Sequence, residues 1–472
     1  MNNLVIMQDM SLNYVARACS GRLLQGSGDA LVLRVTNDSR AIQSGDLFFA
    51  IEGENFDGHD FLAQVDARGA VAVVVDARKT GKYAGLRCAV IEVENPRRAL
   101  GMLAARYRTE FGIPVIAVGG SNGKTSTKEL VGAVLSQKYN TVRSEASFNN
   151  DIGVPVTLLN ITKETDAAVV EVGTNHPGEM KALLQIIRPD MGIITSMGRE
   201  HLEFFKDLSG VEMEEGTLAE VLPADGKLFV CGDEPWGGRM AARSRAGVVY
   251  CGFKENNDWQ ARDIRLNGEG YDFEVIAERP EYSGQYRLNL LGRHQVINAL
   301  YALAVGAELG LSREELASGL AACRPAKMRM QTWLWNGIII LDDAYNANAD
   351  SMKAALETLR EMPCTGRKVA VLGDMAELGE QSLNAHQEVG RMTAQCGVDC
   401  LFAIGTMADC VVEASRSGGL KNAFSHSDQA SVSQALKEFL KPGDMLLLKA
   451  SRSARLERLV ALLKSDTKEL RE

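Results

Sequence analysis

The segment Val115 to Leu130, VIAVGGSNGKTSTKEL, decides the fold of the middle of this chain. An apolar run leads into a glycine-rich turn that ends in Gly-Lys-Thr, and a helix-compatible stretch follows. This is the build of a phosphate-binding loop, in which Lys124 supplies a cation and Thr125 a hydroxyl for Mg²⁺. The sequence therefore predicts nucleotide binding through Gly120, Ser121, Asn122, Gly123, Lys124, Thr125 and Ser126. Val118 stands where the common Walker spacing has a glycine, so the match is to a shorter Gly-x-x-Gly-Lys-Thr loop.

Composition excludes several classes of protein. The chain has 472 residues, of which 46% are hydrophobic and 24% are charged, which is typical of a globular protein with several cores. A net charge of -9 argues against nucleic acid or an anionic membrane surface as a partner. The nine cysteines form no Cys-x-x-Cys pair, the first residues do not read as a signal peptide, and no apolar run reaches the ~20 residues of a membrane span. We expect a cytoplasmic protein without membrane insertion.

The order of apolar runs and turns predicts three α/β domains. Residues 1–108 form a small α/β unit, and residues 109–325 form the phosphate-loop domain, with a mostly parallel sheet covered by helices on both faces. Residues 326–472 form a second, Rossmann-like unit that closes with an amphipathic helix around Leu456 to Leu463.

Polar residues follow the apolar runs of the predicted central sheet, where the ligands of such sheets bind. Glu171 ends the run AAVVEV and is suited, with Thr125, to hold the metal that bridges nucleotide phosphates. The alternative for Glu171 is a solvated carboxylate at a strand end. His201 follows the next run and is ambiguous alone, because a single histidine is usually structural.

Ordered motifs through nearly the whole chain resemble those of the Mur ligases. In the first domain they are Asn37-Asp38-Ser39-Arg40, Gly45 to Ala50 and Asp57-Gly58-His59. In the second they are Asn149-Asn150 with Ile152 to Pro155, Glu171 to His176, His201-Leu202-Glu203, and His294 with Asn298. In the third they are Asp342 to Asn348, Gly373-Asp374-Met375, Glu377-Leu378-Gly379 and His386. Ala349, Ala450 and Ser453 depart from the family's local patterns.

The resemblance is closest to the family members that add D-alanyl-D-alanine to UDP-N-acetylmuramoyl-tripeptide. It implies that ATP, with Mg²⁺, activates the tripeptide carboxylate as an acyl phosphate, which the dipeptide amine then attacks. It places Asp38, Ser39, Arg40, Asn149 and Asn150 toward the UDP-linked substrate, His294, Asn298 and Asp343 toward the nucleotide, and Asn346 and Asn348 toward the dipeptide. It also implies that Lys124 neutralises phosphate charge, that Arg329 or Lys327 reaches the transferring phosphate, and that His201 holds a second Mg²⁺. We expect a monomer.

One departure from the family's motifs affects a residue that the resemblance places at the metal site. The resemblance implies a carbamylated lysine about a dozen residues after His-Leu-Glu, but this chain has no lysine between Lys206 and Lys227. Glu215 aligns with that position, and we hypothesise that its carboxylate is the direct metal ligand. A shifted register would instead place Glu214 or Glu212 there, and a solvated acidic helix face is the remaining alternative.

Three other functions compete with this interpretation. Two are sister activities, a ligase that adds the third amino acid or a folate polyglutamylating enzyme, and the Tyr-Asn-Ala-Asn and Gly-Asp-Met motifs argue against both. The third is a nucleotide-dependent switch or binding protein without ligase chemistry, for which no Asn-Lys-x-Asp guanine motif is present. The sequence does not distinguish diaminopimelate from lysine as the third residue of the tripeptide.

Overall fold

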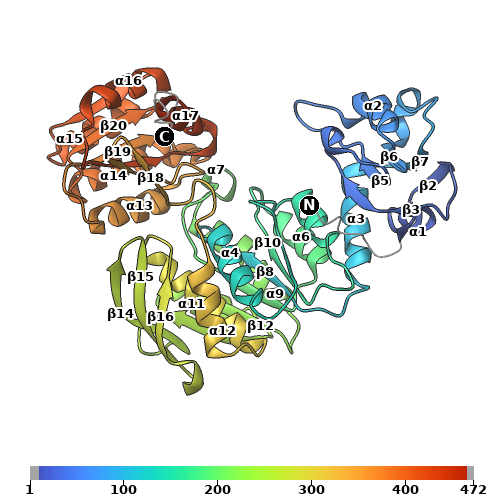
Figure 1. The fold of residues 1–472 in the computed structure, drawn as a ribbon, viewed down its shortest axis with the longest axis horizontal. Coiled ribbons are helices and arrows are strands. Elements are labelled where there is room, and N and C mark those ends of the chain that lie inside the picture. Colours follow the sequence, from blue (N-terminus) through green and yellow to red (C-terminus); the bar gives the residue numbers. More distant parts are fainter. Residues whose placement is uncertain (1–9, 465–472) are drawn as a thin grey trace, which may run out of the picture.

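The computed structural model describes residues 10–464, which form three α/β units, each with a sheet of its own (Figure 1). The first unit has the strand order β2-β7-β6-β5-β4, with β5 to β7 parallel and β2 antiparallel at one edge. Its strands are β2 (Arg22–Gln25), β4 (Arg34–Thr36), β5 (Asp46–Phe49), β6 (Ala72–Asp76) and β7 (Ala89–Val93). A separate pair joins β1 (Met10–Ser11) to β3 (Leu31–Val32), and the helices are α1 (Leu12–Ala18), α2 (Leu62–Ala67) and α3 (Pro96–Arg108).

The central unit has nine strands in the order β16-β15-β14-β13-β12-β11-β8-β10-β9. The strands β8 to β13 are parallel to their neighbours, and β14, which is parallel to β13, begins an antiparallel extension with β15 and β16. The strands are β8 (Val115–Gly119), β9 (Thr141–Arg143), β10 (Ala167–Glu171), β11 (Met191–Ile194), β12 (Lys227–Cys231), β13 (Gly247–Gly252), β14 (Trp259–Asn267), β15 (Gly270–Ala277) and β16 (Gly284–Leu288). The helices are α4 (Lys124–Leu135), α5 (Gly153–Leu158), α6 (Glu179–Ile187), α7 (Leu202–Phe205), α8 (Leu208–Glu215), α9 (Thr217–Val221), α10 (Pro235–Ala241), α11 (His294–Glu308) and α12 (Arg313–Ala322).

Strand β8 lies in the middle of the central sheet and sends side chains into both cores. Val115 and Ala117 pack on the side of α3, α5 and α6, while Ile116 and Val118 pack on the side of α4 and α11. Successive residues of a strand face opposite sides, so a strand covered on both faces is apolar throughout. Val118 is fully buried, which explains why a valine suits this position in the shorter loop.

The third unit has the strand order β17-β18-β22-β19-β20-β21, parallel except for the edge strand β17. Its strands are β17 (Gln331–Trp335), β18 (Ile338–Asp342), β19 (Lys368–Gly373), β20 (Cys400–Ile404), β21 (Ala423–His426) and β22 (Met445–Lys449). Its helices are α13 (Ala349–Glu361), α14 (Ser382–Gln395), α15 (Ala408–Ser417), α16 (Gln429–Phe439) and α17 (Glu457–Lys464).

The predicted fold class, three α/β units with mostly parallel sheets, is confirmed. Helix α3 shares one core with the first unit and with the central sheet, since Leu103 and Val115 belong to the same cluster as Leu47. The exact domain limits at 108 and 325 stay predictions. Within residues 10–464, no helix has the length and apolarity needed to cross a bilayer.

Candidate functional site

Two glycines let the phosphate loop pass close to its neighbours between β8 and α4. Gly120 and Gly123 have φ angles of +107° and +88°, a region that favours glycine. A Cβ atom on Gly120 would lie 2.5 Å from Thr195 Oγ1, and one on Gly123 would lie 3.1 Å from the side-chain amide of Asn298. The loop therefore leads into the N-terminus of α4 by a tight turn, a favourable position for a phosphate.

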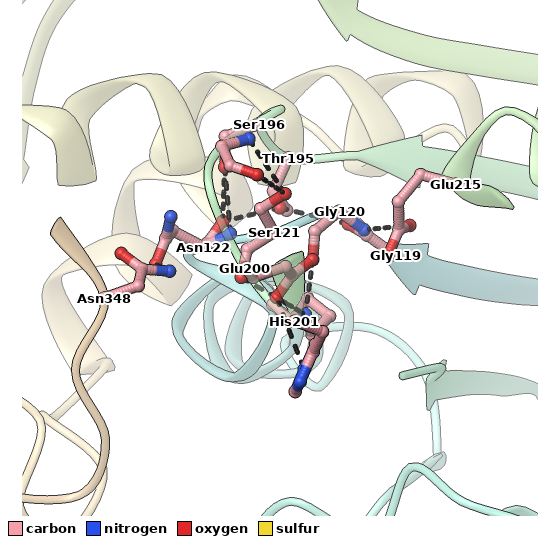
Figure 2. A network of polar contacts seen from close by, with 12 residues as sticks. Gly119, Gly120, Ser121, Asn122, Thr195, Ser196, Glu200, His201, Glu215 and Asn348 are labelled. Carbon is pink, nitrogen blue, oxygen red and sulfur yellow. Dashed lines mark hydrogen bonds and ion pairs between the residues drawn. The ribbon is translucent and has the colours of Figure 1, made fainter. Parts of the chain in front are cut away.

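The loop after β11 holds the phosphate loop in place. Thr195 Oγ1 donates to the carbonyl of Asn122 at 2.6 Å, and Ser196 Oγ accepts from the N–H of Asn122 at 2.9 Å. Figure 2 shows Thr195 and Ser196 beside Asn122, and Gly198 N donates to Ser121 Oγ at 2.9 Å. The segment from Thr195 to His201 thus meets the phosphate loop directly.

Lys124 lies at the start of α4, and its ammonium group faces the loop carbonyls. It donates to Gly120 O and to Ser121 O, and Glu200 Oε2 lies 3.5 Å away. Burial by itself would lower the pKa of Lys124, but the nearby carboxylates of Glu200, Glu215 and Glu171 outweigh it, and the pKa is raised. Lys124 is therefore a permanent cation beside the turn.

Thr125 and Glu171 come together at the carboxyl edge of the sheet. Thr125 Oγ1 lies 3.3 Å from Glu171 Oε1, which also accepts from Asn149 Nδ2 at 2.9 Å. Glu171 is 1% exposed, and its other oxygen, Oε2, is buried without a hydrogen-bond partner. A buried carboxylate oxygen that accepts no hydrogen bond, beside a hydroxyl, is a donor set that suits a hard divalent cation such as Mg²⁺.

Lys128 is a buried cation that sequence reasoning missed. Its side chain is fully buried, and Nζ donates to Ser144 O at 2.7 Å and Ala146 O at 2.6 Å. Nζ also lies 3.9 Å from Glu171 Oε2. The signal was present in the quoted segment, where a lysine stands one turn after Thr125 next to the apolar residues of the same helix.

Glu215 is the last residue of α8 and reaches the phosphate loop from the side opposite Asn348 (Figure 2). Its Oε2 accepts from the N–H of Gly120 at 2.6 Å, and the residue is 2% exposed. Burial raises the pKa of Glu215, against the attraction of Lys124, which lowers it.

The other two acids of α8 have different partners. Glu214 accepts from Gly178 N and Met180 N, both at 2.8 Å, and so satisfies backbone donors at the N-terminus of α6. Glu212 is paired with Arg239 on α10. Of the three candidate positions, Glu215 is the one that contacts the phosphate loop.

His201 is the N-cap of α7 and has a left-handed conformation, with φ of +49°. Its Nδ1 is hydrogen-bonded to Glu377 of the third unit, and its Nε2 lies 3.9 Å from Glu200 Oε2. Among residues 10–464, no three His, Cys, Asp or Glu side chains are grouped to hold a metal ion. A second metal held by His201 and Glu215 thus stays a prediction.

Two asparagines of the third unit, Asn346 and Asn348, line the same cavity as the phosphate loop. Asn348 caps α13 by accepting from Ser351 N at 2.8 Å, and its Nδ2 donates to Asn122 Oδ1 at 3.0 Å. Asn346 Oδ1 accepts from Arg452 N at 3.3 Å. Both side chains therefore already hold local structure, and their assignment to the dipeptide stays a prediction.

Arg329 approaches Thr125 from the segment that leads into the third unit. Its Nη2 lies 3.5 Å from Thr125 Oγ1, its guanidinium lies 4.2 Å from the ring centre of Tyr345, and its Nε is buried without a partner. Lys327, the alternative candidate, is exposed and lines only the outer of two adjoining cavities, whereas Arg329 lines both.

The two cavities meet at Thr125 and Arg329. The inner one, of about 340 Å³, contains the phosphate loop, Glu171, His201, Asn346 and Asn348. The outer one, of about 640 Å³, lies between α4 and the segment from Ala322 to Arg329. The inner cavity thus gathers most of the predicted catalytic residues from two units of the chain.

Of the predicted nucleotide residues outside the loop, His294 and Asn298 lie one turn apart on α11, and Asp343 is near enough to His294 to interact with it electrostatically. Asn298 faces Gly123 and donates to Gln295 Oε1 at 2.9 Å, while His294, at the start of α11, is exposed. Asp343 is ion-paired with the buried Lys449. These contacts leave the adenine-side roles as predictions.

The predicted residues for the UDP-linked substrate are not gathered at this cavity, apart from Asn149. Arg40 is ion-paired with Asp38 on the surface of the first unit, at the start of the turn Ser39–Ala41. Asn150 Oδ1 accepts from the N–H of Gly153, the first residue of α5, at 2.9 Å. A long substrate would have to reach from the first unit to the inner cavity.

Comparison with known families gives three matches along the chain. Residues 32–108 match the model of the Mur ligase family catalytic domain, residues 118–306 match the Mur ligase middle domain, and residues 328–452 match the Mur ligase glutamate ligase domain.

Individual relatives match over nearly the whole length. The UDP-N-acetylmuramoyl-tripeptide–D-alanyl-D-alanine ligase of Bacillus subtilis is 34% identical, over 95% of this chain and 97% of its own. The ligase of the same name from Escherichia coli is 35% identical, over 98% and 99%. Among solved structures, MurF from Acinetobacter baumannii superposes with a TM-score of 0.86 at 30% identity, covering 97% of this chain and 99% of its own. MurF from Thermotoga maritima, in complex with ADP, gives 0.80 at 26% identity, covering 92% and 97%.

Proposed function

Because this chain belongs to the Mur ligase family and is of the MurF type, we propose that it joins D-alanyl-D-alanine to UDP-N-acetylmuramoyl-tripeptide at the expense of ATP. The product is UDP-N-acetylmuramoyl-pentapeptide, a precursor of peptidoglycan, and the activity is of class EC 6.3.2.10. The enzyme works in the cytoplasm as a monomer. The observation that carries the mechanism is the inner cavity, where the phosphate loop and Glu171 face residues of the third unit.

The first step is transfer of a phosphoryl group. A carboxylate oxygen of the tripeptide attacks the γ-phosphorus of ATP, the bond to the β,γ-bridging oxygen breaks, and ADP leaves an acyl phosphate behind. Two anions must meet, so the protein's task is to position them and to neutralise charge. The ammonium of Lys124 and the N–H groups at the start of α4 do this for the phosphates.

The second step forms the peptide bond. The amine of D-alanyl-D-alanine attacks the carbonyl carbon of the acyl phosphate, and inorganic phosphate leaves as the amine loses a proton. We assign Arg329 to the transferring phosphate, because its Nη2 lies 3.5 Å from Thr125 Oγ1 and its guanidinium lies 4.2 Å from the ring centre of Tyr345. We assign the dipeptide to the third unit, near Asn346 and Asn348, and the UDP portion to the first unit, near Asp38, Ser39 and Arg40.

The donor set fits Mg²⁺. Thr125 and Glu171 would hold one ion, because Glu171 keeps a buried carboxylate oxygen without a hydrogen-bond partner. His201 and Glu215 would hold a second, with Glu215 in place of the carbamylated lysine of the family. Bound there, the cations supply positive charge that lowers the repulsion between phosphate and carboxylate.

Phosphate release with defined substrates tests this function. Purified protein is incubated with ATP and Mg²⁺ and with UDP-N-acetylmuramoyl-tripeptide and D-alanyl-D-alanine, singly and together. The products are identified by mass spectrometry. We expect phosphate release only with both substrates, together with the mass of the UDP-pentapeptide. Lys124→Met should abolish both signals, whereas Lys138→Met, which changes an exposed lysine just after the same helix, should retain them. Release without the pentapeptide would reject the proposed acceptor.

A further inference from the structure

Arg199 binds two carboxylates that lie on two different helices of the third unit. Its Nη2 lies 2.9 Å from Asp350 Oδ1, in the first turn of α13, and its Nη1 lies 2.6 Å from Glu388 Oε2, on α14. The backbone N–H of Arg199 also donates to Asp350 Oδ2 at 2.8 Å. A guanidinium can bind two carboxylates at once because its donors form a planar fork.

On its own side, Arg199 is fixed to the phosphate loop. The preceding residue, Gly198, donates to Ser121 Oγ at 2.9 Å, and Ser196 Oγ accepts from Asn122 N at 2.9 Å. A Cβ atom on Gly198 would lie 2.8 Å from Asp350 Oδ2, so the backbone of this loop and α13 lie very close. A movement of α13 away from the phosphate loop must therefore break the contacts of Arg199.

Weaker contacts surround this ion-pair cluster. Asn348 Nδ2 donates to Asn122 Oδ1 at 3.0 Å, and Glu203 N donates to Glu377 O at 3.1 Å. Helix α7, which begins three residues after Arg199, lies against the third unit (Figure 1). The loop from Gly198 to Glu203 is thus one region of contact between the central and third units, separate from the contacts of Tyr271 with Glu361 and of Glu269 with Thr332.

We propose that Arg199 is a positioning residue that holds the third unit closed over the phosphate loop and thereby sets the apparent affinity for the dipeptide. This rests on the proposed function, in which the dipeptide binds to the third unit. Asp350 and Glu388 both belong to the third unit, so without Arg199 closure loses the attraction between these carboxylates and the cation of the central unit. A ligand that binds only the closed form loses apparent affinity in proportion to the closed fraction.

Steady-state kinetics separate this role from a catalytic one. We expect Arg199→Ala to raise the KM for D-alanyl-D-alanine about tenfold, which corresponds to ~1.4 kcal/mol. The kcat at saturating dipeptide and the KM for ATP should stay near the wild-type values, because saturating dipeptide restores the closed form. Arg199→Lys should have a KM for the dipeptide between those of the wild type and Arg199→Ala, because one ammonium group cannot bind two carboxylates in the way that a planar guanidinium does. Arg262→Ala, which removes an exposed ion pair with Glu274 inside the central unit, should behave like the wild type.

Small-angle X-ray scattering gives a readout that does not depend on activity. We expect a larger radius of gyration for Arg199→Ala than for the wild type and Arg262→Ala, with equal thermal unfolding temperatures. An Arg199→Ala variant with unchanged KM for the dipeptide and unchanged radius of gyration would overturn the proposal. A fall in kcat with unchanged KM would also overturn it, because it would place Arg199 in the chemistry. If the wild type makes no pentapeptide, the proposed function fails, while scattering still decides the role of Arg199 in closure.

Discussion

The carboxylate of Glu215 accepts a hydrogen bond from the N–H of Gly120, at 2.6 Å, in a place where only 2% of the glutamate is exposed. The contact joins the end of α8 to the phosphate loop. Burying a carboxylate costs free energy unless charges and donors compensate it, and here Lys124 and one backbone N–H offset the cost only in part, because burial still raises the pKa of Glu215. A costly acid held against a phosphate loop is better explained by function than by packing.

Glu215→Gln should make the protein more stable while it impairs ligation. The pKa of Glu215 is raised by burial from an ordinary value of 4.5 to about 7. A group with a raised folded-state pKa stabilises the fold at acid pH and loses that contribution as pH rises through the folded value. Thermal unfolding without nucleotide or Mg²⁺ should thus show a gain in Tm for the variant that is larger at pH 8 than at pH 5.

Glu214→Gln is the matched control, since Glu214 adjoins Glu215 but accepts from the backbone at the start of α6. Its Tm should fall at neutral pH, because an amide is a weaker acceptor at a helix N-terminus. Equal Tm changes in the two variants would show that Glu215 is an ordinary structural acid.

Lys128→Met should destabilise the site from within. The substitution leaves the carbonyls of Ser144 and Ala146 without their donor and removes a cation 3.9 Å from Glu171. Loss of one partner from such a buried arrangement costs about 3 kcal/mol. We expect a lower Tm and weaker binding of Mn²⁺, measured by electron paramagnetic resonance with ADP present. A variant that binds Mn²⁺ as tightly as the wild type would show that Lys128 does not position Glu171 for metal binding.

Arg329→Lys should lower kcat more than it lowers nucleotide affinity. The guanidinium is positioned by the ring of Tyr345, 4.2 Å away, and a lysine ammonium does not stack in the same way. Loss of one positioned donor to a transferring phosphate lowers kcat by about 100-fold. Arg279→Lys alters another arginine over an aromatic ring, that of Tyr282, and should leave kcat unchanged. ADP binding measured by calorimetry should be similar in both variants, and an intact kcat in Arg329→Lys would exclude its role at the phosphate.

The sequence predicted what local patterns encode. The glycine-rich turn before Lys124 and the apolar run before Glu171 were sufficient to predict a parallel sheet with a phosphate loop at the carboxyl end of its strands. Contacts between units were not predictable in this way, because they join residues far apart in sequence. Arg199 with Glu388, and His201 with Glu377, depend on the packing of the third unit against the central one.

The alignment register of α8 was the other feature that the sequence did not fix. Along α8 the family resemblance favoured Glu215, but a shifted register left Glu214 and Glu212 as alternatives, because the helix pattern alone does not fix which face turns inward. Packing assigns each to a different neighbour: Arg239, the start of α6, and Gly120.

The central claim is our proposal that the carboxylate of Glu215 takes the place of the carbamylated lysine that the family resemblance implies. The most direct measurement is the rate of UDP-pentapeptide formation in buffer stripped of CO₂, before and after bicarbonate is added back, for the wild type and Glu215→Gln. The account predicts that the wild type forms pentapeptide at the same rate in both conditions and that the variant is strongly impaired in both. A wild-type rate that depends on bicarbonate, or a Glu215→Gln variant with full activity, would contradict it.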